Sequence, residues 1–108
     1  MNWIRITEAS NIPPREGRAI DLPGQPLAIF NLGERFVAIE NRCPHNGGPL
    51  ADGIVGGTTV TCPLHNWRIC LDSGNVSKPC QPGLDAVRTF PVRIEEGIVS
   101  IGISEVNQ

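Results

Sequence analysis

Long apolar runs are absent from this sequence. No segment approaches the roughly 20 consecutive apolar residues of a membrane-spanning helix. The first eight residues carry charges where a signal peptide needs an apolar stretch. Positive charge is scarce as well: the net charge of -2, with no block of like charge, argues against a nucleic-acid binder. We therefore expect a soluble, cytoplasmic protein without a membrane or nucleic-acid partner.

A sustained apolar period of 3.6 residues is also missing, which argues against long helices. The chain has instead 12 glycines and 10 prolines, which favour short strands joined by tight turns. The expected strands are residues 3–6, 15–20, 26–32, 35–40, 54–55, 58–61, 67–71, 87–94 and 98–101. Pro26 would suit an edge strand, because proline donates no hydrogen bond to a neighbouring strand. We expect one all-β domain, 1–108, an antiparallel β-sandwich or partly open barrel of roughly nine to eleven strands.

Two predicted loops carry residues that can bind a metal. The first contains Cys43 and His45 and the second contains Cys62 and His65, so that the pattern is C-x-H, a gap of 16 residues, and C-x-x-H. These are both histidines of the chain and two of its four cysteines. In a reducing cytosol, paired cysteines indicate metal binding rather than a disulfide.

Three interpretations of this pattern are open. The first is that the pattern is a coincidence, with the cysteines acting as small buried hydrophobic residues. The second is structural zinc in a non-redox interaction module, since two Cys and two His form a common zinc set. Zinc fingers usually pair like with like, however, and here each loop offers one Cys and one His. The third is a Rieske [2Fe–2S] cluster, in which two Cys hold one iron and two His hold the other. The mixed pairing favours the third interpretation.

The motif residues resemble the Rieske family. They read C-P-H-x-G-G-x-L at residues 43–50 and C-P-L-H-x-W at residues 62–67. The resemblance implies a Rieske-like sandwich with a small cluster-binding subdomain inserted at about residues 41–69. It also implies that the protein carries single electrons and has no substrate site of its own.

The resemblance assigns a role to each of the four candidate ligands. Cys43 and Cys62 would bind the buried iron. His45 and His65 would bind the outer iron and reach solvent, so that a redox partner would dock around them.

Missing residues within the motif indicate the type of Rieske protein. High-potential members carry an additional Cys in each loop, at positions that correspond here to Gly48 and Leu64. They also use a Ser and a Tyr hydroxyl to hydrogen-bond the cluster, whereas this chain has Asn66 after the second His and no tyrosine at all. Fewer donors to the sulfurs leave the reduced state less stabilised. We therefore expect a potential in the lower half of the family's span.

The longer resemblance is to the small subunit of assimilatory NAD(P)H-dependent nitrite reductase. It covers residues 3–19, 41–45, 47–55, 60–67 and 87–93. It implies a large partner subunit with flavin and sirohaem, which reduces nitrite to ammonium in nitrate assimilation. The alternative is a stand-alone Rieske ferredoxin that serves a reductase and an aromatic-ring dioxygenase.

The remaining cysteines, Cys70 and Cys80, are expected to be free thiols. Cys70 falls on the strand face opposite Trp67, Ile69 and Leu71, and Cys80 lies in a proline-rich stretch. A disulfide or a redox switch is the other possibility.

Overall fold

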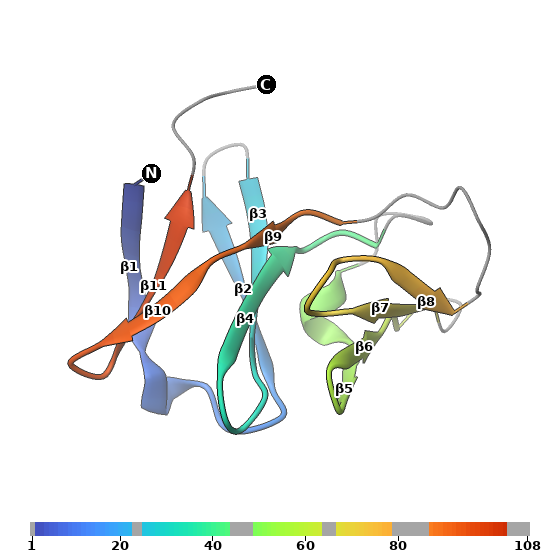
Figure 1. Ribbon diagram of the computed structural model, residues 1–108, viewed down its shortest axis with the longest axis horizontal. Coiled ribbons are helices and arrows are strands. Elements are labelled where there is room, and N and C mark those ends of the chain that lie inside the picture. The colour runs from blue at the N-terminus through green and yellow to red at the C-terminus, as the bar shows by residue number, and fades with distance from the viewer. Residues whose placement is uncertain (1, 23–24, 44–48, 64–66, 79–86, 104–108) are drawn as a thin grey trace.

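The computed structural model describes residues 2–22, 25–43, 49–63, 67–78 and 87–103. Within these residues the chain forms three antiparallel sheets and two short 3₁₀ helices (Figure 1). Sheet A has the order β1 (Asn2–Glu8), β11 (Ile98–Ile103), β10 (Val92–Glu95). Sheet B has the order β2 (Gly17–Leu22), β3 (Gln25–Asn31), β4 (Phe36–Glu40), β9 (Thr89–Phe90). Sheet C has the order β5 (Ile54–Gly56), β6 (Thr59–Thr61), β7 (Arg68–Cys70), β8 (Val76–Lys78). The 3₁₀ helices are η1 (Ala9–Asn11) and η2 (Leu50–Asp52), and the predicted all-β antiparallel fold is confirmed.

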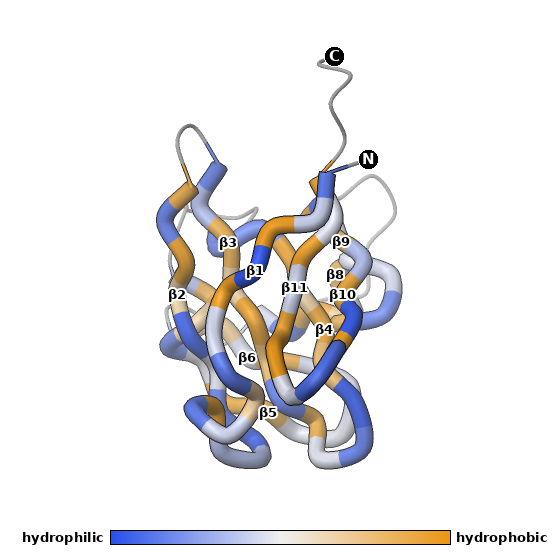
Figure 2. Tube along the Cα trace, turned by 90° about the vertical axis from the view of Figure 1, so that its left-hand side faces the viewer, coloured by the Kyte–Doolittle hydropathy of each residue, from blue (hydrophilic) through white to orange (hydrophobic). Residues whose placement is uncertain are grey.

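Sheet B is the middle layer, and both of its faces are buried. Successive side chains of a strand point to opposite faces. On β3, Leu27 and Ile29 therefore pack into the core shared with sheet A, whereas Ala28 and Phe30 pack into the core shared with sheet C. We call these the A–B core and the B–C core. This two-sided burial explains why β3 is apolar along most of its length. The hydropathy colouring in Figure 2 shows hydrophobic residues on β11 as well.

The expectation that Pro26 marks an edge strand is wrong. β3 lies between β2 and β4, and Pro26 pairs with Asp21 near one end of the strand. There, the carbonyl of Pro26 still accepts a hydrogen bond from the backbone N–H of Asn41 at 3.0 Å. A proline near the end of a strand removes one donor and leaves the rest of the ladder intact, so the strand can be internal.

The predicted strand 87–94 is in fact two strands in two sheets. β9 pairs with β4 in sheet B, and β10 pairs with β11 in sheet A. Pro91 separates them, and its carbonyl accepts the N–H of Gly102 at 2.9 Å. Because proline cannot donate to a ladder, the chain changes sheets at this residue. The passage from β9 to β10 joins the sheets at the centre of the molecule (Figure 1).

Sheet C is built from one continuous stretch of the chain, residues 54–78, whereas sheets A and B combine both ends of the chain. The hairpin β5–β6 and the strand β7 match the sequence expectation. β8 was not expected, since no strand was predicted between residues 71 and 87. Among the described residues, no helix is long and apolar enough to cross a membrane.

Candidate metal centre

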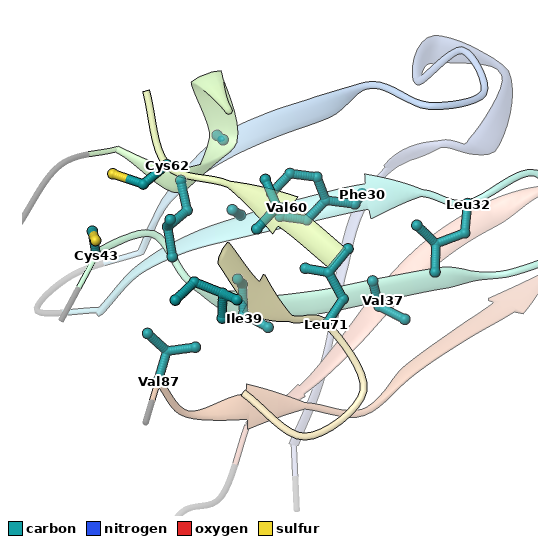
Figure 3. Close-up of a cluster of buried hydrophobic side chains, with 13 residues drawn as sticks. Phe30, Leu32, Val37, Ile39, Cys43, Val60, Cys62, Leu71 and Val87 are labelled. Carbon is teal, nitrogen blue, oxygen red and sulfur yellow. The ribbon is translucent and has the colours of Figure 1, made fainter. Parts of the chain in front are cut away.

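Two of the four predicted ligands, Cys43 and Cys62, lie in the B–C core. Cys43 follows β4 by three residues, and Cys62 directly follows β6. Each is only 1% exposed, and both belong to the same apolar core. Figure 3 places both sulfurs at the same end of this core, beyond Ile39. The fold thus brings together two thiols that are 19 positions apart in the chain.

The other two predicted ligands, His45 and His65, lie outside the described residues. Each belongs to a segment that continues from one of the buried cysteines: 44–48 follows Cys43, and 64–66 begins two residues after Cys62. Among the described side chains, no three Cys, His, Asp or Glu residues come together as a metal site. The placement of the histidines therefore stays a prediction.

The first ligand loop is closed at its base by Asn41. The side-chain oxygen of Asn41 accepts the backbone N–H of Ala51, the middle residue of η2, at 2.8 Å. The helix η2 is anchored from the other side, because Leu50 is fully buried and Ala51 is 8% exposed. Asn41 is not part of the metal-binding pattern, and its only signal in the sequence is an asparagine at the end of a predicted strand.

The two ends of the second ligand loop are joined by a backbone hydrogen bond, and the strand before it, β6, lies against the residue that follows η2. The N–H of Cys62 donates to the carbonyl of Trp67 at 2.6 Å. Gly53, just after η2, lies so close to β6 that an added Cβ would collide with the carbonyl of Thr61 and lie 2.8 Å from Val60. Because Thr61 precedes Cys62, this contact holds the two loop bases together.

An apolar shell surrounds the two thiols. The other buried members of this core include Ile39, Val60, Ile69 and Val87, and Trp67 packs against the same core. Such a shell limits the access of water to a metal centre and so influences its redox potential. Two buried thiols from two loops, each followed in the chain by a histidine, fit the ligand set of a Rieske cluster.

An ion pair connects sheet C to sheet B at the end remote from the thiols. Arg35, in the turn between β3 and β4, forms an ion pair with Asp72 at 2.6 Å, just after β7. Both side chains are more than 40% exposed, so solvent screens the pair and its contribution to stability is small.

Cys70 is a free thiol outside the candidate site. It is partly exposed at the end of β7, while its neighbours Ile69 and Leu71 are buried, as the alternation in the sequence predicts. A hydrogen bond from the side chain of Ser73 is the main cause that lowers the pKa of Cys70 below its ordinary value of 9.0. The Ser73 hydroxyl oxygen also accepts the N–H of Asn75 at 3.2 Å, which leaves its proton available to the sulfur. Cys80 lies outside the described residues.

Comparison with known proteins identifies the family. The family model "Rieske [2Fe-2S] domain" matches residues 2–91. The 3-phenylpropionate/cinnamic acid dioxygenase ferredoxin subunit of Escherichia coli K12 is 36% identical over 107 residues, 97% of both chains.

Two solved structures resemble the chain over nearly its whole length. One is a chain of the complex of reduced oxygenase and oxidized ferredoxin in carbazole 1,9a-dioxygenase, with a TM-score of 0.84, 26% identity, and 92% of this chain and 100% of that chain covered. The other is a Mycobacterium tuberculosis protein assigned as an NADH-dependent nitrite reductase small subunit, with a TM-score of 0.87, 25% identity and 97% of both chains covered. The family match, with the buried thiol pair, settles the cofactor class: the chain belongs to the Rieske [2Fe–2S] domain family and is a one-electron carrier with a Rieske-type cluster.

Proposed function

We propose that this protein is the ferredoxin component of an oxygenase system, which carries electrons from a reductase to an oxygenase that acts on an aromatic compound. The observation that carries the proposal is the 36% identity to a dioxygenase ferredoxin subunit over 97% of both chains. The match extends over nearly the whole of both chains and so is not confined to the cluster motif. The likeness to a chain in an oxygenase–ferredoxin complex supports the same function.

We further propose that Cys43 and Cys62 hold the inner iron and that His45 and His65 hold the outer iron. The bound cluster supplies a reversible one-electron centre. The chain's own residues bind and shield it: the two cysteines occupy the apolar B–C core, where they are 1% exposed, and the shell around them excludes water. All four ligand positions are filled by protein, so the site has no open position for a substrate. The protein is then one domain, 1–108, whose cluster-binding part spans about 41–69.

The second candidate is the small subunit of an NAD(P)H-dependent nitrite reductase. Two observations favour it: the TM-score of 0.87 to the Mycobacterium tuberculosis protein, and the motif segments at residues 41–45, 47–55 and 60–67. From the sequence alone, we expected this candidate rather than the ferredoxin. We rank it second because 36% identity to a ferredoxin subunit exceeds 25% identity to that protein at the same coverage.

Electron transfer to purified partners tests the two candidates. The holoprotein is added to a reductase and an aromatic-ring dioxygenase, and substrate oxidation is measured. In parallel, the tagged protein is isolated from its host and the bound proteins are tested for sirohaem. We expect stimulation of the dioxygenase and no sirohaem. Copurification with a sirohaem protein, without stimulation of any dioxygenase, would favour nitrite reduction instead.

The ligand assignment is tested with two cysteine variants. Cys62→Ser should lose iron and the rhombic spin-resonance signal of the reduced cluster, because a hydroxyl is a poor substitute for a thiolate. Cys70→Ser is the matched control, since Cys70, like Cys62, belongs to the part of the chain that forms sheet C, but it lies outside the candidate site. Equal iron content in both variants would contradict the assignment. A colourless wild-type protein loaded with zinc would contradict the cluster itself.

A further inference from the structure

Asn41 connects three parts of the molecule at the base of the first ligand loop. It directly follows β4 and lies two residues before Cys43. Its backbone N–H donates to the carbonyl of Pro26 on β3 at 3.0 Å. Its side-chain oxygen accepts the N–H of Ala51 in η2 at 2.8 Å. The residue is therefore fixed to sheet B by its main chain and to η2 by its side chain.

The side-chain contact joins Asn41 to Ala51, ten positions later in the chain, so that nine residues lie between them. The loop contains Cys43 and the proposed ligand His45. Its far end is immobilised by burial, since Leu50 is fully buried and Ala51 is 8% exposed. Its near end is held by the Asn41 main chain. Among the residues that the structure describes, the side-chain hydrogen bond is the polar contact that joins the two ends of the loop, and it fixes the distance between them.

We propose that Asn41 is a positioning residue for the cluster. By holding Ala51 of η2 at a fixed distance from the end of β4, its side-chain oxygen keeps η2 against the segment that leads to Cys43, and so limits the access of water to the cluster. The inference rests on the ligand set proposed above. A partly buried N–H without its acceptor is costly, so loss of the Asn41 oxygen would draw water to Ala51 and loosen the loop.

A matched residue in sheet B separates positioning from general stability. Asn31 is 8% exposed, its side-chain oxygen accepts the N–H of Gly33 at 2.7 Å, and its side-chain nitrogen donates to the carbonyl of Ile12 at 2.7 Å. It thus closes a turn with the same chemistry as Asn41. Asn31 lies at the opposite end of β3–β4 from the ligand loop, since β3 ends and the turn to β4 begins there.

The experiment compares Asn41→Ala, Asn41→Asp and Asn31→Ala as purified holoproteins. The measurements are the rate of iron release to a chelator, the midpoint potential and the spin-resonance spectrum of the reduced cluster. For Asn41→Ala we expect iron release about fivefold faster, the factor that corresponds to one lost hydrogen bond. We also expect a higher midpoint potential, because water stabilises the more negative reduced cluster.

Asn41→Asp keeps the acceptor and adds a negative charge. We expect its iron release to stay near the wild-type rate while its midpoint potential falls, opposite to Asn41→Ala. Asn31→Ala should lower the unfolding temperature and leave the iron release rate, potential and spectrum unchanged. If Asn41→Ala does not fold, Asn41→Gln, which displaces the amide by one carbon, should show the same direction of change.

Three results would overturn the inference: unchanged iron release and spectrum in Asn41→Ala or its Gln substitute, equal changes in Asn31→Ala, or rapid iron release in Asn41→Asp. In each case the wild type still carries the cluster, so the ligand proposal stands. A wild-type protein without a [2Fe–2S] signal would instead defeat the ligand proposal.

Discussion

Replacement of Gly53 by alanine should destabilise the protein through one contact. Gly53 has φ -78° and ψ 176°, a conformation that alanine adopts without strain. The obstacle is space alone, because the new Cβ would collide with the carbonyl oxygen of Thr61 and lie 2.8 Å from Val60 and 3.2 Å from the carbonyl of Leu50. Two of these three neighbours are backbone atoms, which cannot turn away as a side chain can.

The size of the effect follows from what must move. The register pairs Ile54 with Thr61, so separation of Gly53 from Thr61 strains the first pair of the β5–β6 ladder. Overpacking of this kind costs about 1–3 kcal/mol, and we expect the upper part of that range because the obstacle is a carbonyl. In a domain of about 100 residues, 1 kcal/mol lowers the unfolding temperature by about 4–8 °C. Gly53→Ala should therefore unfold about 10–20 °C below the wild type.

Gly56 supplies the control, because it is an exposed glycine of the same hairpin with no atom within 4 Å of an added Cβ. Gly56→Ala should be neutral or stabilise by up to about 1 kcal/mol, since alanine restricts the unfolded chain. Unfolding of both holoproteins is followed by far-ultraviolet circular dichroism and by the visible absorbance of the cluster, at one scan rate. In Gly53→Ala, the cluster absorbance should be lost at the same lower temperature, because Thr61 precedes Cys62.

Equal unfolding temperatures for Gly53→Ala and the wild type would refute this reasoning. So would an equal loss in Gly56→Ala, because the effect would then come from the general cost of alanine in this hairpin.

Three further predictions concern reactivity, docking and potential. Ser73→Ala should raise the pKa of Cys70, so alkylation of Cys70 at pH 8 should become slower, as measured by peptide mass spectrometry. At about pH 11 the alkylation rates of the variant and the wild type should converge. Equal rates at pH 8 would contradict the Ser73 hydrogen bond. Ile54 is 75% exposed and pairs with Thr61, the residue before Cys62, whereas Ile94 is 45% exposed in sheet A. If the partner docks at the cluster, Ile54→Ser should raise the apparent KM for the redox partner about fivefold, the worth of a partly buried apolar side chain, and Ile94→Ser should leave it unchanged; the opposite order would place docking on sheet A. The midpoint potential should lie in the lower half of the family span of about -150 to +300 mV, and a value near the top would show that the missing tyrosine and loop cysteines do not control it.

Sequence patterns predicted the architecture where the deciding interactions are local. Period-two alternation and the glycines between the predicted strands located the hairpins. Three of these glycines, Gly33, Gly57 and Gly97, have positive φ, which side-chain-bearing residues rarely adopt. Strand partners depend on distant residues, and there the predictions failed. Pro26 was assigned to an edge strand although β3 lies between β2 and β4, and Pro91 was read as part of one strand although the chain changes sheets at it.

The sequence alone determined the chemistry of the site, because few residue types bind iron and their order in two short loops distinguishes two irons from one. The family match bears out the cofactor, and the four individual ligands stay a prediction. Only the tertiary structure decided what holds those loops. It placed Cys43 and Cys62 in one apolar core, Ala51 within hydrogen-bonding distance of Asn41, and Thr61 against Gly53. The physical reason is the sequence separation of the residues involved. The ligand types are recognised from neighbouring residues in the chain, whereas packing and loop closure join residues that are far apart in the sequence.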